Sequence, residues 1–293
     1  MKVFLTGGSG FVGSAVLSQL IGTGHEVLTL ARSNASAEAL RAAGAEVLAG
    51  DLDNLDALQK GAEQSEGVVH IAFTNDFSQI MASSAQDAKA IETMGSAFEG
   101  SDRPLVITSV GIIGKPSPSQ PAVETFLDRS NPNPMRMTEF AGADVADRGV
   151  NISVVRLPQV HNTMRQGIPG MMRQLAEGKK VSAYIGDGAN RWAAAYLDDV
   201  ALLYQLALER KRPGSVYHAV GEEGVALKEI AEAIGTKLRV PVISISMEEA
   251  QAHFGPIAVL VGADMSVSNT ITKEVLGWSP VGPGLLSDLQ QAQ

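Results

Sequence analysis

The chain has 293 residues, 45% of them hydrophobic, and a formal net charge of −9. This length allows one sizeable α/β domain with a smaller lobe, and the lack of a basic stripe argues against nucleic acid and anionic membranes as partners. With no cysteine and five scattered histidines, the sequence offers neither disulfides nor a ligand pair at metal-binding spacing, so we expect no metal site. No apolar run is long enough to span a bilayer, and we expect a soluble, unprocessed, cytoplasmic protein.

Short apolar runs alternate with longer amphipathic ones over the first half of the chain, a pattern typical of a parallel sheet covered by helices on both faces. The first helix, at 11–24, has an apolar face with Phe11, Val16 and Leu20. We predict six strands, at residues 2–6, 26–31, 45–50, 67–73, 104–110 and 151–157. The handedness of successive strand–helix–strand units then predicts a doubly wound parallel sheet of the Rossmann type.

The second half predicts a smaller, mainly helical C-terminal lobe. We expect a helix from about Asp199 to Arg210, capped by Asp198, and a strand at 216–221 that returns to the sheet. Further helices are predicted near 168–178, 227–238 and 247–254, and short strands at 181–186 and 242–246. We therefore divide the chain into a nucleotide-binding domain, residues 1–160 with 190–220, and a substrate-binding lobe, residues 161–189 with 221–293.

The segment VFLTGGSGFVGS places Gly7, Gly10 and Gly13 at three-residue intervals between the first strand and the first helix. Glycines at this spacing let the chain turn tightly and let backbone N–H groups approach a pyrophosphate at the positive end of the helix. The pattern by itself also fits a plain tight turn. Within a parallel sheet it indicates a dinucleotide site, to which we assign these glycines together with Ser9, Phe11 and Val12.

The end of the second strand indicates which dinucleotide binds. It reads Ala31-Arg32-Ser33 and lacks the carboxylate that binds the ribose 2′-hydroxyl of NAD. The Arg32 guanidinium and the Ser33 hydroxyl can both bind a 2′-phosphate, which favours NADP(H); a solvated loop residue is the alternative for Arg32. Asp51, which precedes Leu52 at the end of the third strand, can contact the adenine or form a turn.

The order and spacing of several segments resemble the extended or atypical branch of the short-chain dehydrogenase/reductase superfamily, the NAD(P)-dependent epimerase/dehydratase-like proteins. These segments are TGGSGFVG, GDL, VVHIAF, ITSVGIIG, VVRLPQVHN, GDGANRW, YLDDVA and LGWSP, and they cover nearly the whole chain. The resemblance implies that Ser109 hydrogen-bonds the substrate oxygen; a hydroxyl that satisfies a backbone group is the alternative. It also implies cofactor contacts for Ala72, Phe73, Pro158 and Val160, and a homodimer formed through helices near 78–98 and 136–148.

Members of this family usually carry Tyr-x-x-x-Lys about 25 residues after that serine, and the tyrosine protonates the reacting oxygen. Aligned on Thr138-Glu139, these two positions fall near Asn131 and Met135 in SNPNPMRMTEF, a stretch that contains neither residue type. A positioned acid contributes about 10²- to 10⁴-fold to the rate, so another group must act or the substrate must not need one. Candidate donors are Tyr196, His161 and Tyr184, for which packing or structural polar roles are the alternatives, and Arg136 can stabilise an oxyanion by its charge.

Candidate substrate contacts are Asn75, His161 and Trp192. Asn75 begins a loop after the fourth strand and can equally cap the next helix. The resemblance implies that His70 lies beside the nicotinamide, although a histidine at the end of a strand is more often structural. The stretches GIPGMM and GPIAVLVG suit either an adaptable apolar pocket wall or core packing.

Together these features predict an NADP-dependent oxidoreductase, a reductase of a small, rather apolar carbonyl, imine or activated C=C compound. The alternative is an NADP(H)-binding redox sensor that signals through a protein partner with little or no catalysis. A sugar-nucleotide epimerase or dehydratase ranks lowest, because it needs the missing tyrosine as a base.

Overall fold

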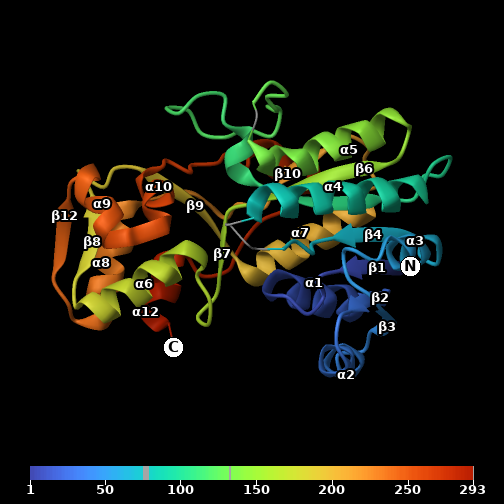
Figure 1. Cartoon of the computed structure of the whole chain (residues 1–293), viewed down its shortest axis with the longest axis horizontal. Helices are drawn as coiled ribbons and strands as arrows, with labels where there is room; N and C mark the ends of the chain where they lie inside the picture. Colours follow the sequence, from blue (N-terminus) through green and yellow to red (C-terminus); the bar gives the residue numbers. More distant parts are fainter. Residues whose placement is uncertain (75–78, 132, 293) are drawn as a thin grey trace.

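The computed structural model describes residues 1–74, 79–131 and 133–292, and within them it confirms the doubly wound architecture (Figure 1). The main sheet is entirely parallel, with strand order β10-β6-β5-β4-β1-β2-β3. Its strands are β1 (Lys2–Thr6), β2 (Glu26–Ala31), β3 (Glu46–Ala49), β4 (Gly67–His70), β5 (Leu105–Val110), β6 (Ile152–Leu157) and β10 (Val216–His218). All six predicted strands and the returning strand are confirmed, with ends that shift by up to three residues.

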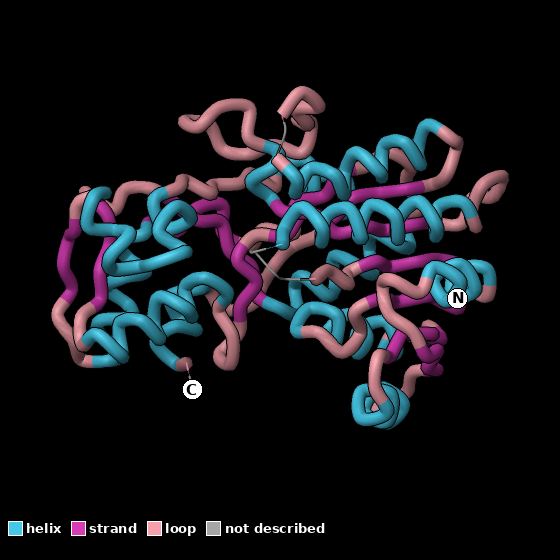
Figure 2. Tube along the Cα trace, in the orientation of Figure 1, coloured by secondary structure: helices cyan, strands magenta, loops and turns pink. Residues whose placement is uncertain are grey.

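Helices cover both faces of this sheet (Figures 1 and 2). One face carries α1 (Phe11–Gly22), α2 (Asn34–Ala42) and α7 (Leu197–Arg210), and the other carries α3 (Leu55–Glu63), α4 (Ile80–Ser96) and α5 (Met137–Asp147). Successive side chains of a strand point to opposite faces, so in β1 Val3 and Leu5 pack with the first group of helices and Phe4 packs with the second. Full burial of such a side chain contributes about 1.5–3 kcal/mol.

The second lobe lies at one end of the long axis of the molecule (Figure 1). Its strands β8 (Ser182–Ile185) and β12 (Val242–Ile245) pair in parallel. Its helices are α6 (Gly167–Lys179), α8 (Leu227–Leu238), α9 (Met247–Phe254), α10 (Ala258–Gly262) and α12 (Leu285–Gln291). A short 3-10 turn occurs in this lobe at Gly255–Ile257, and two others occur in the larger lobe at Gly111–Gly114 and Pro134–Arg136. The predicted helices and strands of this half are therefore confirmed.

A three-stranded sheet connects the two lobes. It places β9 (Arg191–Tyr196) between β7 (Gln159–His161) and β11 (Glu222–Ala226). Trp192 of β9 packs in the core of the small lobe, whereas Trp278, which follows α11 (Thr270–Leu276), packs in the core of the large one. Each of the two predicted parts of the chain thus contributes a tryptophan to the core of the other lobe. The division of the chain at residue 160 stays a prediction.

The start of α7 differs from the sequence prediction. The helix begins at Leu197, Tyr196 occupies the N-cap position, and no side chain caps the helix, so the prediction of Asp198 as the cap was wrong. The carboxylate of the next residue, Asp199, accepts hydrogen bonds from the backbone N–H groups of Val281 at 3.1 Å and Gly282 at 2.8 Å. These bonds fix the C-terminal segment against the large lobe.

A buried ion pair connects β6 to α5. The fully buried Arg156 donates two hydrogen bonds to the Glu139 carboxylate, at 2.8 and 2.7 Å, and others to the carbonyls of Val123 at 3.1 Å and Phe126 at 2.9 Å. Removing one partner of such a pair costs about 3–5 kcal/mol, because a charge is left buried without compensation. The cluster therefore fixes the segment before α5, and with it the start of that helix.

His218, at the end of β10, is held neutral beside this ion pair. Its Nδ1–H donates to the Ser268 carbonyl at 2.6 Å, and its Nε2 accepts from Arg156 Nη1 at 3.2 Å. Burial lowers the pKa of His218 to about 4; the Glu124 carboxylate opposes this shift and the Arg156 guanidinium adds to it. A histidine that is neutral when folded stabilises the fold above its unfolded pKa of about 6.5, and this stabilisation is lost as the pH falls toward 4.

We therefore predict that His218 makes the fold acid-sensitive. Between pH 6.5 and 5.0 its contribution to the free energy of unfolding should fall by about 2 kcal/mol. Urea unfolding of the wild type and of His218→Gln at several pH values measures this, with the wild type losing stability more steeply. Parallel pH profiles for the two proteins would contradict the assignment.

Candidate active site

A cleft of about 920 Å³ runs along the carboxyl ends of β1 to β6. It spans the point where the strand order reverses, between β1 and β4, which is where open α/β sheets bind ligands. Of the residues predicted to bind the cofactor, all except Ser33 and Pro158 line this cleft: Gly7, Ser9, Gly10, Phe11, Val12, Gly13, Arg32, Asp51, Leu52, Ala72, Phe73 and Val160. The structure thus brings together residues from five segments that are distant in sequence.

The glycine loop packs so closely that side chains are excluded. Gly7 has φ +78°, and a Cβ there would lie 2.8 Å from the backbone nitrogen of Ala72. A Cβ on Gly13 would lie 2.0 Å from the carbonyl oxygen of Gly7. Because Gly7 and Gly13 have no side chains, the start of α1 lies directly against the ends of β1 and β4.

The N-terminus of α1 is open to an anion. Its N-cap residue is Gly10, no side chain caps its first N–H groups, and its first turn contains no acidic residue. Unpaired N–H groups and the helix dipole together favour a phosphate at such a position. The residues present therefore fit the pyrophosphate of a dinucleotide.

The end of the cleft formed by β2 and β3 carries Arg32, which is exposed. Ser33 turns away to cap α2, where its Oγ accepts the N–H of Ser36 at 3.2 Å. Asp51 lines the cleft, and its Oδ1 also accepts the N–H groups of Asp53 at 3.0 Å and Asn54 at 3.2 Å. Asp51 thus forms the turn that was the alternative to an adenine contact.

The opposite end of the cleft contains an unpaired hydroxyl. Ser109 is 6% exposed, lines the cleft, and its Oγ has no hydrogen-bond partner among the described residues. The neighbouring Thr108 satisfies a backbone group instead, since its hydroxyl donates to the carbonyl of His70 at 2.7 Å. A buried polar group without a protein partner is satisfied by a water molecule or by a ligand, and the place of Ser109 in the cleft lining gives a ligand access to it.

A chain of four buried side chains reaches the lining of the same cleft. Thr6 Oγ1 is 2.6 Å from His70 Nδ1, His70 Nε2 is 2.9 Å from Asp87 Oδ1, and Thr138 Oγ1 donates to Asp87 Oδ2 at 2.5 Å. His70, Asp87 and Thr138 all line the cleft. Sequence analysis missed Asp87 and Thr138. The available signal was that Asp87 falls on the buried face of α4, in helical register with Ala90, Ile91 and Met94.

The hydrogen bonds fix the tautomer of His70. Thr6 Oγ1 accepts the backbone N–H groups of Ile71 and Ala72, both at 3.2 Å, so its own hydrogen is directed to His70 Nδ1. His70 then carries its hydrogen on Nε2 and donates it to Asp87. The Asp87 carboxylate is thereby held between two donors at the edge of the cleft.

Several other predicted residues lie away from the described cleft lining. Arg136 is buried and donates to the carbonyl of Asp128 at 3.4 Å, and its neighbours Met135 and Thr138 line the cleft in its place. The ring of Tyr196 packs against Gly282. Partial burial, and next the Asp198 carboxylate, raise the pKa of Tyr196, which makes it a weaker acid.

Two of the three predicted substrate contacts, His161 and Trp192, are not part of the described cleft lining. His161 is fully buried, with its Nδ1 2.7 Å from Asp288 Oδ2, and Trp192 is fully buried, with its Nε1–H donating to the Ala263 carbonyl at 3.0 Å. Asn75 lies outside the described residues. The ring of Tyr184 packs beside Gly188 and under Lys228, and the stretches GIPGMM and GPIAVLVG contribute Met172, Ile257, Ala258 and Val261 to the small-lobe core.

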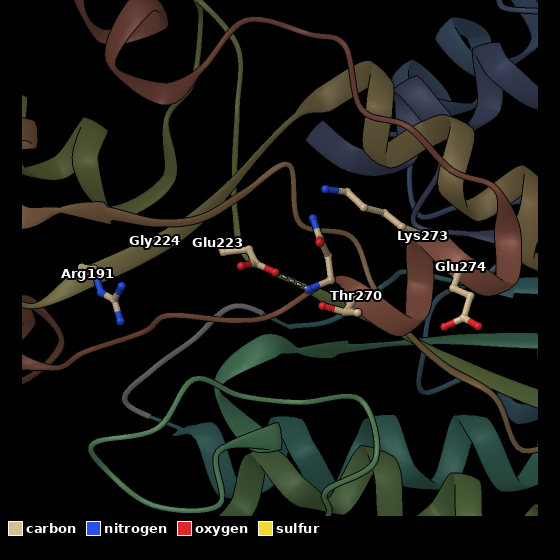
Figure 3. A pocket seen from close by; sticks show the side chains of 7 residues that line it. Arg191, Glu223, Gly224, Thr270, Lys273 and Glu274 are labelled. Atoms are coloured by element: carbon tan, nitrogen blue, oxygen red, sulfur yellow. Dashed lines mark hydrogen bonds between the residues drawn. The ribbon is translucent and has the colours of Figure 1, made fainter.

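A second depression, of about 890 Å³, lies on the small-lobe side (Figure 3). Figure 3 shows Arg191 and Lys273 on opposite sides with Glu223 between them, and Glu223 Oε1 accepts the backbone N–H of Asn269 at 3.0 Å. Its lining contains no glycine loop, and the helix that begins in it, α11, has only seven residues, so the long cleft is the better candidate. Within the described part of the chain, no group of three or more His, Asp or Glu side chains is arranged to hold a metal ion, and no helix is long and apolar enough to cross a membrane.

Comparison with known proteins agrees with this geometry. The model of the NAD dependent epimerase/dehydratase family matches residues 3–220. The chain is 42% identical to the uncharacterized protein C2A9.02 of Schizosaccharomyces pombe and 39% identical to the uncharacterized protein YLL056C of Saccharomyces cerevisiae, in each case over 99% of this chain and 98% of the relative. DesIV, the dTDP-glucose 4,6-dehydratase of Streptomyces venezuelae solved with NAD and TYD bound, superposes with a TM-score of 0.78 at 18% identity, covering 99% of this chain and 96% of that one.

The chain therefore belongs to the NAD-dependent epimerase/dehydratase family, within the extended short-chain dehydrogenase/reductase superfamily. The resemblance noted in the sequence is confirmed. Proteins of this family bind a nicotinamide dinucleotide, which agrees with the cleft at the carboxyl ends of the strands.

Two glycines of α1 provide a matched test of the close packing in the glycine loop. Gly13→Ala should destabilise the fold by about 1–3 kcal/mol and abolish dinucleotide binding, because the Gly7 carbonyl must move. Gly22→Ala, where a Cβ meets nothing within 4 Å, should instead raise stability by about 0.5–1 kcal/mol. Thermal unfolding and nucleotide titration of both variants measure this; a Gly13→Ala protein that unfolds and binds like the wild type would refute the close packing.

Proposed function

We propose that the protein is an NADPH-dependent reductase of a small, rather apolar carbonyl, imine or activated C=C compound. The observation that carries the proposal is the buried hydroxyl of Ser109, which has no partner among the described residues and lines the same cleft as His70 and Asp87. When bound, NADPH supplies the hydride. Ser109 polarises the acceptor atom by donating a hydrogen bond to it, and Phe73, Val110, Met135 and Leu157 supply apolar walls for a small substrate.

The preference for NADP(H) over NAD(H) rests on Arg32. It lines the end of the cleft formed by β2 and β3, and no carboxylate follows β2 to bind a free 2′-hydroxyl or repel a 2′-phosphate. A guanidinium can bind such a phosphate through two parallel hydrogen bonds. Ser33, although its oxygen caps α2, still has a hydrogen to donate.

We infer that Asp87 and His70 replace the missing tyrosine and lysine, since residues 130–140 contain neither residue type. In the structure Thr138 Oγ1 donates to Asp87 Oδ2. A proton delivered to Asp87 from solvent reverses this hydrogen bond and frees the Thr138 hydrogen for the acceptor atom of the substrate. The acceptor gains this proton after its carbon gains the hydride, Thr138 recovers a proton from Asp87, and Asp87 recovers one from solvent when product leaves. The His70 Nε2–H holds the carboxyl group in place throughout.

The second candidate is an NADP(H)-binding sensor, and the composition of residues 130–140 favours it. Such a protein binds the nucleotide tightly, turns over nothing, and changes its affinity for a protein partner with the redox state of the nucleotide. A homodimer formed through α4 and α5 and a cytoplasmic location stay predictions.

A panel of ketones, enones and imines tests the reductase, with NADPH consumption followed by absorbance. The wild type should reduce at least one member, and Ser109→Ala and Asp87→Asn should each lower kcat by about 10²- to 10⁴-fold, with NADPH affinity within about threefold of the wild type. Ser96→Ala, an exposed serine at the far end of α4, is the matched control and should keep full activity.

The outcomes separate the two candidates. Failure of the wild type to oxidise NADPH with any member of the panel would contradict the reductase proposal. Tight NADPH binding in that protein would then support the sensor. Full activity of Asp87→Asn would contradict the role of Asp87 as the proton source but would leave the reductase proposal unaffected.

A further inference from the structure

An arginine that sequence analysis did not single out lies over the start of α1. Arg165 lines the cleft, and its guanidinium carbon lies 5.4 Å from the centroid of the Phe11 ring, the first residue of that helix. Arg165 belongs to the loop at 162–166 between β7 and α6, the segment through which the chain enters the small lobe (Figure 1).

The loop holds the backbone of Arg165 in place. Asn162 Oδ1 accepts the N–H groups of Met164 and Arg165, both at 2.9 Å, and the N–H of Asn162 donates to the Arg165 carbonyl at 2.8 Å. The side chain of Gln166 donates to the Asn162 carbonyl at 2.7 Å. The position from which the guanidinium extends is therefore set before any ligand arrives.

The guanidinium itself has no polar partner among the described residues. Across the described ranges it forms neither a hydrogen bond nor an ion pair, whereas Arg156 pairs with Glu139 and Arg148 pairs with Glu99. The first turn of α1, over which it lies, contains no acidic residue that could pair with it. Asp53, an acid at the other end of the cleft, accepts a hydrogen bond from Gln86 at 2.6 Å.

We propose that Arg165 binds the pyrophosphate of the dinucleotide and closes the cleft over it. The inference rests on the proposed NADP(H) site and adds a residue to it. The uncapped N–H groups of α1 hold the pyrophosphate from one side, and the fork of N–H donors on Arg165 binds its oxygens from the other. Because the loop leads directly into α6, the bound cofactor also links the small lobe to the nucleotide-binding lobe.

A surface arginine that only stacks on Phe11 is the competing explanation, and binding measurements separate the two. Arg165→Met keeps an apolar stem over Phe11 but removes the charge, and Arg165→Lys keeps the charge but removes the planar fork. Arg212→Met is the control, since Arg212 is exposed and follows α7 at the opposite edge of the sheet. The probes are NADPH, which contains the pyrophosphate, and adenosine 2′-phosphate, which does not.

Arg165→Met should weaken NADPH binding by roughly 10- to 100-fold and leave adenosine 2′-phosphate binding within about twofold of the wild type. Arg165→Lys should fall between Arg165→Met and the wild type, and the loss should shrink in 1 M salt because screening weakens the contact. The control should bind both ligands normally.

Unchanged NADPH affinity in Arg165→Met, or an equal loss for both ligands, would overturn the inference and leave the proposed function intact. A wild-type protein that binds neither NADPH nor NADH would overturn both together.

Discussion

The close packing of Gly7 and Gly13 is the constraint on which the rest of the site depends. The chain turns after β1 only because no side chain separates Gly7 from the backbone of Ala72, or Gly13 from the carbonyl of Gly7. This packing aims the start of α1 at the point where the strand order reverses. The uncapped N–H groups of the helix therefore open into the cleft, and an anionic ligand is the natural partner for them.

The same constraint reaches the other end of the cleft through Thr6. Its hydroxyl accepts the N–H of Ala72, which packs on Gly7, and donates to His70, which in turn donates to Asp87. Thr6 thus connects the glycine loop to the pair formed by His70 and Asp87. The buried pair of Arg156 and Glu139 holds α5 from the opposite side, and Thr138 stands next to Glu139 at the start of that helix. The hydrogen bonds that run from Thr6 to Asp87 and the ion pair of Arg156 therefore both reach the start of α5, where Thr138 is the proposed proton donor.

Features set by local pattern could be predicted from the sequence. The strands appear as short apolar runs because the sheet is buried on both faces, and the glycine loop follows from its position between a strand and a helix, whereas Ser109 was named through the family resemblance. Asp87 and Thr138 could not be found this way, because successive members of their network lie 64, 17 and 51 residues apart. Trp192 was expected at the substrate, yet the pairing of β9 with β11 turns it into the small-lobe core, and local sequence does not encode that pairing.

The central claim is that the cleft takes a dinucleotide whose adenosine carries an additional phosphate. Calorimetric titration of the wild type and of Arg32→Ala with NADPH and NADH tests it most directly. The account predicts that the wild type binds NADPH about 10- to 100-fold more tightly than NADH and that Arg32→Ala loses most of this preference. Equal or tighter binding of NADH by the wild type, or no measurable binding of either nucleotide, would contradict it.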